Sequence, residues 1–249
     1  MKNIFTAVTL LLVLASCSTG SNYTITGSID GAIEGDSVTL GYSVDGVNFV
    51  TESKTAIENG EFIFKGTVDG CKIYYIGYDN AIEPTYTLFF LEEGNINVEV
   101  SAEASIVSGT PANDLNAEVE NHLAQYVNRL YEYQFRIYSD TLMTDSTRSA
   151  INIQATEIQR NASLYIQDVI RENINSIVSM FLLVQYSDLF DDDELAQLID
   201  RIPKRHIDRE NNCLYDILKE IQADREDSHH NEESDESNPY AIFSDTVIE

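Results

Sequence analysis

The spacing of apolar residues changes once along this chain, at Ser108-Gly109-Thr110-Pro111. Before this point, over residues 23–107, short runs rich in Val, Ile, Phe, Tyr and Thr alternate with Gly, Asp and Asn, as in strands joined by tight turns. After it, apolar residues recur every three or four positions, which is the spacing of one helix face. The change predicts an α+β protein, in which an antiparallel β-sandwich or small barrel precedes a helical bundle.

The β part is expected to contain a series of short strands. They are predicted at residues 23–29, 37–42, 49–57, 61–68, 72–78, 86–91, 96–100 and 105–108. The pair Asn59-Gly60 predicts a hairpin turn, because both residues tolerate positive φ. We therefore take residues 23–108 as the β domain.

Two long apolar stripes follow, and Thr110 and Pro111 suit the cap and first position of the first helix. The first stripe is Leu115, Val119, Leu123, Tyr126, Leu130, Tyr133 and Ile137, and the second is Ile151, Ala155, Ile158, Ala162, Tyr165 and Val169. Stripes of this length joined by a short loop predict an antiparallel helix pair.

Shorter helices are expected to complete a helical domain over residues 109–222. Asn175 or Ser176 is expected to cap a very apolar helix. Asp191-Asp192-Asp193 supplies cap and dipole charge for the next, which ends before Pro203. Leu214, Ile217, Leu218 and Ile221 form the buried face of the last. Residues 223–249 are rich in Asp, Glu, Ser and His, so we expect an acidic tail without fixed structure.

The N-terminus has the order of a secretory signal. Lys2 precedes an apolar run at residues 4–14, which is shorter than the roughly 20 residues that a membrane-spanning helix needs. Leu14-Ala15-Ser16-Cys17 resembles the lipobox of bacterial lipoproteins. The resemblance implies a signal peptide over residues 1–16, removed by cleavage, and lipid (thioether-linked and acyl) on Cys17. An ordinary signal that is cut elsewhere is the alternative.

Residues 17–22 then form a lipidated tether that holds the folded part at a membrane. Ser18 follows the lipidated position, and no acidic stretch comes directly after it. In Gram-negative lipoproteins this resembles delivery to the outer membrane with the protein facing the periplasm. We therefore expect a cell-envelope protein.

The charge of the chain excludes some classes of partner. Acidic residues number 42 against 15 basic ones, for a net charge of −27. Such a surface repels nucleic-acid phosphates and anionic lipid headgroups. We therefore expect no nucleic-acid partner, and membrane attachment through the lipid on Cys17.

The ordered motifs of the β part carry a family resemblance. They are Tyr23-Thr24-Ile25-Thr26-Gly27-Ser28-Ile29, Asp36-Ser37-Val38-Thr39-Leu40, Asn59-Gly60-Glu61-Phe62-Ile63-Phe64-Lys65-Gly66, Leu88-Phe89-Phe90-Leu91-Glu92-Glu93-Gly94 and Val107-Ser108-Gly109-Thr110. In this order they resemble the DUF4369 domain of Bacteroidota lipoproteins. In that family the domain usually precedes a helical linker and a thioredoxin-like domain of the TlpA/AhpC-TSA type.

The chain departs from that family at its redox site. It has no Trp and no Cys-x-x-Cys, whereas a disulfide oxidoreductase needs a low-pKa cysteine beside a resolving one. Apart from Cys17, only Cys71 and Cys213 are present, and they either pair or act as small buried hydrophobic residues. The redox activity of the family's partner domain therefore does not carry over.

Other candidate sites have simpler interpretations. His229-His230 among carboxylates is more typical of a solvated tail than of a metal site, and Asp191-Asp192-Asp193-Glu194 is typical of a helix cap. Tyr74, Tyr75, Tyr78 and Tyr86 are either core residues or a glycan-binding patch. Thr141 and Thr246 follow Asp and precede an apolar residue, which resembles the O-glycosylation acceptor of Bacteroidota.

The sequence thus predicts no catalytic, cofactor-binding or metal-binding residue, and no enzyme activity. We expect a non-catalytic, lipid-anchored lipoprotein that acts as a binding or interaction module in the envelope, with an envelope protein as the candidate partner. The alternative is an accessory to a separate thioredoxin-like thiol-disulfide protein.

Overall fold

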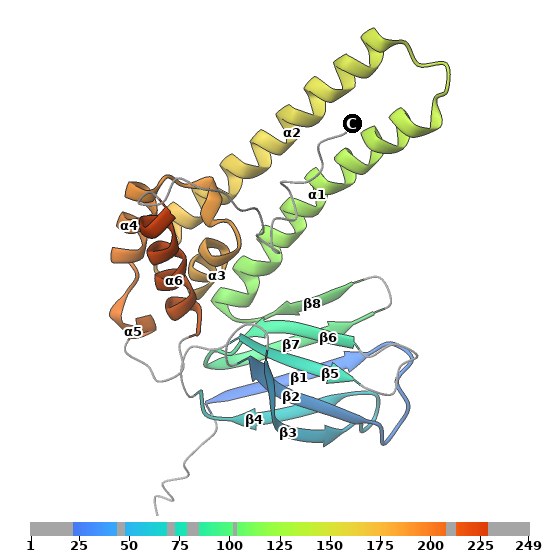
Figure 1. Ribbon diagram of the computed structural model, residues 1–249. Helices are drawn as coiled ribbons and strands as arrows, with labels where there is room; N and C mark the ends of the chain where they lie inside the picture. The colour runs from blue at the N-terminus through green and yellow to red at the C-terminus, as the bar shows by residue number, and fades with distance from the viewer. Residues whose placement is uncertain are drawn as a thin grey trace, which may run out of the picture.

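The structure is a computed structural model and describes residues 22–43, 48–68, 73–78, 85–101, 104–207 and 213–228. Strands come first in the chain and helices second, so the predicted α+β class is confirmed (Figure 1). The strands are β1 (Tyr23–Ile29), β2 (Ser37–Ser43), β3 (Phe49–Ala56), β4 (Phe62–Gly66), β5 (Ile73–Tyr78), β6 (Thr85–Phe90), β7 (Gly94–Val100) and β8 (Ser105–Ser108). Each lies where a strand was predicted.

The strands form two four-stranded sheets, ordered β4-β1-β7-β8 and β3-β2-β5-β6. The sheets do not close, so of the two predicted architectures the sandwich is correct and the barrel is not. Their facing sides share one apolar core, to which Ile25 and Ile96 contribute from the first sheet and Leu40 and Ile76 from the second. Each of these four side chains is at most 1% exposed.

The sequence led us to expect a wholly antiparallel sandwich, but one pair of neighbouring strands is parallel. β1 pairs in parallel with β7 and antiparallel with β4. Parallel neighbours need a long crossover, and here the chain passes through strands of both sheets before β7 returns beside β1. Alternating apolar residues indicate which face of a strand is buried but carry no information on the direction of its neighbour.

The Asn59-Gly60 turn forms as predicted, with φ values of 55° and 81°. It does not produce a long hairpin, because β3 and β4 belong to different sheets. Pairing across the turn is limited to one bridge, in which the Glu58 N–H donates to the Glu61 carbonyl oxygen at 2.8 Å. The turn therefore guides the chain from one sheet to the other.

The helices are α1 (Pro111–Ser139), α2 (Asp145–Glu172), α3 (Ile177–Gln185), the 3₁₀ helix η1 (Ser187–Leu189), α4 (Asp192–Asp200), α5 (Lys204–Ile207) and α6 (Cys213–Ser228). The predicted antiparallel pair is confirmed as the α1–α2 hairpin, which projects away from the rest of the molecule (Figure 1). The other helices pack around the base of this hairpin. No helix in the described part of the chain is both long enough and apolar enough to span a bilayer.

Several helix ends lie where the sequence predicted them. Of the two candidates for the α3 cap, Ser176 is correct, since its Oγ accepts from the Val178 N–H. Asp191 caps α4 by accepting from the Glu194 N–H at 2.8 Å. Thr110 precedes α1 as predicted, but its side chain accepts from Asn113 instead of capping the backbone.

Helix α6 extends past Gln222, where we expected the ordered part to end. The Arg225 guanidinium explains this extension. It donates to Asp188 at 2.8 Å, to Asp192 at 3.2 Å and to the Phe190 carbonyl oxygen at 3.1 Å. A cation in an acidic segment thus holds the end of α6 against η1 and α4.

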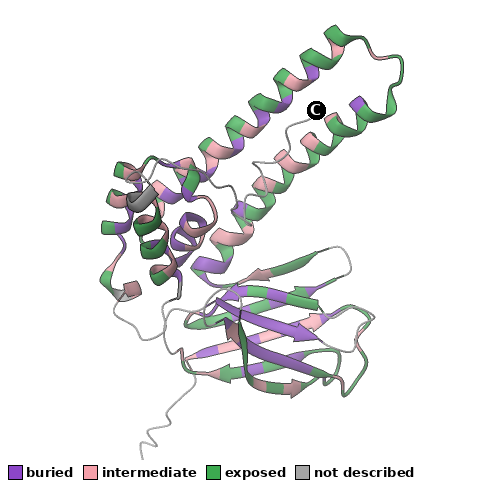
Figure 2. Cartoon of the chain, in the orientation of Figure 1, coloured by how far each residue is buried: buried purple, intermediate pink, exposed green. Residues whose placement is uncertain are grey.

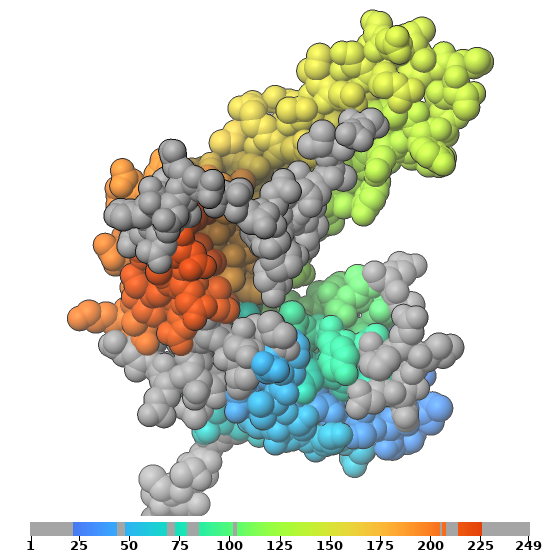
Figure 3. Space-filling model, viewed as in Figure 1, coloured from blue at the N-terminus to red at the C-terminus, as the bar shows by residue number. Residues whose placement is uncertain are grey.

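A second apolar core fills the space between the helices, and it includes two residues of the sandwich, Ile73 and Phe90. The Phe90 ring meets the Phe181 ring of α3 edge-on, with centroids 5.5 Å apart. Burial is concentrated in the sandwich and the base of the hairpin, whereas exposed residues prevail toward the hairpin's free end (Figure 2). The strands and helices therefore share a packed junction from which the hairpin extends (Figure 3).

Candidate functional site

Most of the sequence-predicted modification sites lie outside the described residues, namely Cys17, Cys71 and Thr246. Cys213 begins α6, and its side chain is also outside the described part. Thr141 lies in the exposed turn between α1 and α2, so this candidate acceptor is at the free end of the hairpin.

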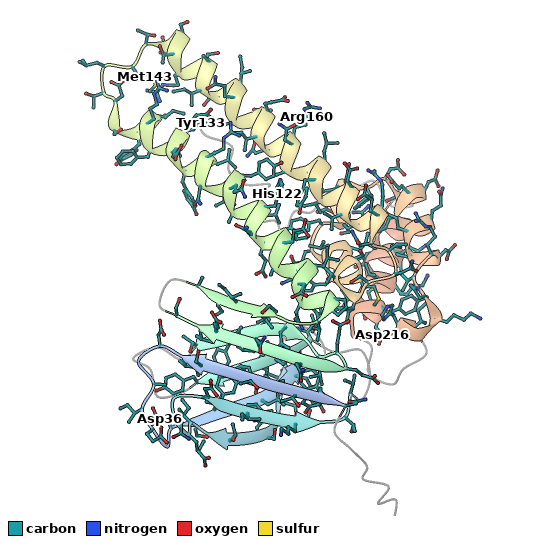
Figure 4. All side chains as sticks on the ribbon, turned by 180° about the vertical axis from the view of Figure 1, so that it is seen from behind. Asp36, His122, Tyr133, Met143, Arg160 and Asp216 are labelled. Carbon is teal, nitrogen blue, oxygen red and sulfur yellow. The ribbon has the colours of Figure 1, made fainter. Side chains whose placement is uncertain are left out.

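The histidines within the described part have structural partners. The His122 ring stacks on Tyr165 of α2, with centroids 4.1 Å apart and planes at 15°. Figure 4 shows His122 and Tyr133 between the two helices of the hairpin. His206 Nε2 lies 2.9 Å from the Asn175 carbonyl oxygen. His229 and His230 lie outside the described residues.

The predicted metal-binding alternatives gain no support in the described part. No three His, Cys, Asp or Glu side chains there are placed to share an ion. Asp191 serves as the α4 cap, and Asp192 pairs with Arg225, so the cap interpretation of this acidic run is confirmed.

Of the four tyrosines considered as a glycan patch, three are buried. Tyr74, Tyr75 and Tyr78 are 4–6% exposed. The Tyr74 hydroxyl donates to Glu52 at 2.9 Å, and burial together with this carboxylate raises the pKa of Tyr74. The packing interpretation is confirmed for these three. Tyr86 differs, because it is 62% exposed and lies on the outside of β6.

The sequence reasoning missed a second apolar face on α1. Tyr131, Phe135 and Tyr138 are 64%, 72% and 88% exposed. At about 100° per residue they lie on one side of α1, roughly opposite the stripe that faces α2. The exposure of three large aromatic rings on one helix face is unusual in a solvated monomer and is typical of an interaction surface.

This face continues down α1 with a regular spacing. Its members, which we call the outer face of α1, are Ala117, Asn121, Ala124, Asn128, Tyr131, Phe135 and Tyr138. They recur at alternating steps of four and three, which is the spacing of a coiled-coil seam. This signal was visible in the sequence, but Ala and Asn at the first four positions made it weaker than the stripe toward α2.

The lower end of the outer face opens into a groove of about 830 Å³ between α1 and the edges of the two sheets. Its sheet side is lined by Tyr86 and Leu88 of β6 and by Ile106 of β8, all at least 47% exposed. Ala117 and Ala124 line its helix side. Because β6 and β8 are both edge strands, the groove also borders unpaired backbone. Groove and outer face together form one continuous, largely apolar surface.

The free end of the hairpin differs in charge from the rest of the chain. Between residues 129 and 160, Arg129, Arg136, Arg148 and Arg160 balance Glu132, Asp140, Asp145 and Glu157. This segment therefore has no net charge, whereas the whole chain carries −27. Another acidic molecule is therefore repelled less strongly at this segment than at the rest of the surface.

A smaller hollow of about 450 Å³ lies at the junction of the helices, bordered by Glu92, Glu172 and His206 among others. Two of these side chains are already in contact with backbone atoms. Glu92 accepts from the Ala112 N–H at 2.7 Å, at the start of α1, and His206 contacts Asn175. The hollow thus belongs to the packing of the junction.

Comparison with known proteins gives one match. Neither the curated proteins nor the solved structures contain a match to this chain. Residues 23–116 match a protein-family model described as a domain of unknown function, DUF4369. The match covers the entire sandwich and enters the first turns of α1, ending just before Ala117, where the outer face begins. The resemblance inferred from the ordered motifs is thus confirmed for this domain: residues 23–116 are similar to DUF4369.

Proposed function

We propose that this protein is a non-catalytic, lipid-anchored lipoprotein of the cell envelope, and that its α1–α2 hairpin is the module through which it binds a protein partner. The observation that carries this proposal is the outer face of α1, with Tyr131, Phe135 and Tyr138 exposed side by side. Exposed aromatic clusters with little net charge are the usual composition of interface centres.

The position of the hairpin relative to the tether supports a protein partner. Asn22, where the tether meets the sandwich, donates to Glu93 at 2.9 Å, and the neighbouring Glu92 accepts from Ala112 of α1. The tether and the start of α1 are therefore close together. From there the 29 residues of α1 extend over about 43 Å. An anchor at Cys17 would thus hold the aromatic rings far from the point of attachment (Figure 1).

A photoreactive phenylalanine analogue at position 135 tests the hairpin as the binding module. In intact cells we expect it to form protein adducts, because Phe135 is 72% exposed and lies between the exposed rings of Tyr131 and Tyr138 on the outer face. The analogue at position 153 is the control, since Ile153 is 69% exposed but lies on α2, away from the outer face. Combining Tyr131→Ser and Tyr138→Ser should lower the yield at position 135 at least about tenfold, because buried aromatic anchors each contribute about 2 kcal/mol or more.

Equal labelling at positions 135 and 153, or no labelling at either, would contradict the proposed binding module.

The accessory role beside a thioredoxin-like protein is tested in the same cells. If Cys71→Ser with Cys213→Ser abolishes the adducts at position 135, the interaction depends on thiol chemistry and the accessory role is favoured. A purely noncovalent module keeps its adducts in that variant.

The anchor itself has a separate test. Cys17→Ser removes the atom to which lipid would attach, so we expect loss of metabolic labelling by palmitate and release of the protein from the membrane fraction. Ser18→Ala is the matched control, and it should remain labelled and membrane-bound. Retention of Cys17→Ser in the membrane, without label, would show that another feature attaches the protein. Peptides from the same samples, analysed by mass spectrometry, report whether Thr141 or Thr246 carries a glycan.

A further inference from the structure

We propose that the partner of the outer face is a second copy of this chain, bound antiparallel about a two-fold axis so that the free end of each hairpin fills the groove of the other. This inference rests on the proposed binding role of the hairpin and names its partner. It is supported by the way the outer faces of two copies complement each other in the size, polarity and charge of their side chains.

The size of the side chains changes along the outer face. Small residues, Ala117 and Ala124, lie at its base, and large ones, Tyr131, Phe135 and Tyr138, lie toward its free end. A parallel pair would place alanine against alanine and ring against ring. An antiparallel pair places the large half of one helix against the small half of the other, which is the complementarity that close packing requires.

The seam spacing fixes the register of such a pair. In antiparallel coiled coils the positions reached by a step of four pack against those reached by a step of three. One register uses the entire outer face. It sets Ala124 against Phe135 of the partner subunit, and Ala117 against Leu142 of the partner subunit, which is 90% exposed in the turn after α1. The two-fold axis repeats both contacts, so the interface closes as a dimer.

The polar positions of the seam agree with this register. Asn128 lies opposite Tyr131 of the partner subunit, and Asn121 lies opposite Tyr138 of the partner subunit. An amide and a phenol hydroxyl can hydrogen-bond at the rim of an apolar seam. A buried Asn in a seam specifies alignment at a cost in stability, so these two residues act as alignment marks.

The position of the groove also supports this register. Ala117 lines it, and it is bordered by the exposed side chains of Leu88 and Ile106. The arriving end of the other hairpin would bring Leu142 of the partner subunit against both. The unfilled volume of about 830 Å³ and the most exposed apolar residue of the hairpin would thus cover each other.

The distribution of charge favours this surface, over the other surfaces of the chain, as the place where two copies meet. Two chains of −27 repel each other over most of their surfaces. The segment from 129 to 160 carries no net charge, and it is the part that each copy would insert beside the other. Approach through the hairpins therefore keeps the strongly acidic regions apart.

Disulfide trapping in membranes of cells that express the full chain tests the proposal. The background carries Cys71→Ser and Cys213→Ser and keeps Cys17 for the anchor. Adding Ala124→Cys and Phe135→Cys together should shift the monomer band to a band of twice its mass under mild oxidation. Within one chain these positions are about 16 Å apart along α1, too far for a bond, so only a partner can supply the second thiol. Both residues are exposed, so the substitutions leave the packed cores intact.

The two single variants distinguish the remaining arrangements. Antiparallel pairing predicts no dimer from Ala124→Cys alone or from Phe135→Cys alone, whereas parallel pairing joins each position to itself and would overturn the register. Absence of dimer from the double variant overturns the second copy as partner. If the analogue at position 135 nevertheless gives adducts of another mass, the hairpin still binds a partner and only its identity as a second copy is wrong.

Discussion

Asn113→Ala should lower the free energy of unfolding by about 3 kcal/mol, which is a large effect for a substitution without a change of charge. Asn113 is 2% exposed and lies in the first turn of α1. Its amide oxygen accepts from the Phe90 N–H at 3.0 Å, and its amide nitrogen donates to the Phe90 carbonyl oxygen at 2.8 Å. The side chain thus completes the backbone pairing of edge strand β6, and its loss leaves two buried polar groups without partners, each costing about 1–3 kcal/mol.

Asn116→Ala is the matched control for this prediction. The Asn116 amide donates to Glu120 at 2.8 Å, but that contact is exposed to solvent. We expect a change within about 0.5 kcal/mol, as for most surface substitutions. Urea unfolding of both variants, followed by circular dichroism, measures the difference. Equal stability of the two variants would mean that water takes the place of the Asn113 side chain, and that the junction between the strands and the helices is open to solvent.

Leu183→Ala should cost roughly 2–5 kcal/mol, because it creates a cavity in the helical core. Leu183 is 0% exposed and lies on α3, between the hairpin base and α6. Two costs add up: the lost free energy of burying the removed atoms, and the cost of the cavity that remains. The cavity remains because helices packed on several sides collapse only partly around the removed atoms. Thermal unfolding should show a lowered midpoint while the secondary structure at low temperature stays the same.

Leu164→Ala provides the comparison for that loss. Leu164 is on α2 and is 42% exposed, so much of its side chain already contacts water. Alanine also has the higher helix propensity, which offsets part of the lost contact. We expect a change below about 1 kcal/mol. If Leu183→Ala were as mild as this control, the helical core would have to be loosely packed.

The strands and long helices were predictable because each has one strongly periodic buried face. Ile25 alternates with half-buried neighbours in β1 and Phe64 with exposed neighbours in β4, and Val119 recurs with Ile137 on the side of α1 that faces α2. The direction of β7 beside β1 was not predictable, because alternation is the same for parallel and antiparallel neighbours. The extension of α6 was also missed, since it depends on Arg225 meeting Asp188 in a distant segment.

The candidate site was largely hidden in the sequence for a physical reason. A helix with two apolar faces gives two overlapping patterns, and the better-filled one dominates the periodicity. The stripe toward α2 contains apolar residues at every step, whereas the outer face includes Asn121 and Asn128. Only burial distinguishes the faces, because it shows that Phe135 is 72% exposed while Val119 is 1% exposed.

The parallel pairing of β1 has a mechanical consequence. Any pull on the N-terminal tether enters the fold at Tyr23, the first residue of a strand bonded to β4 on one edge and to β7 on the other. Load along that strand must shear both rows of hydrogen bonds at once. A pull on the free end of the hairpin instead reaches β6 through Asn113 and reaches β8 through the start of α1, and both are edge strands that can be peeled away bond by bond. Under tension between the two ends, the junction of helices and sandwich would therefore yield before the tethered strand does.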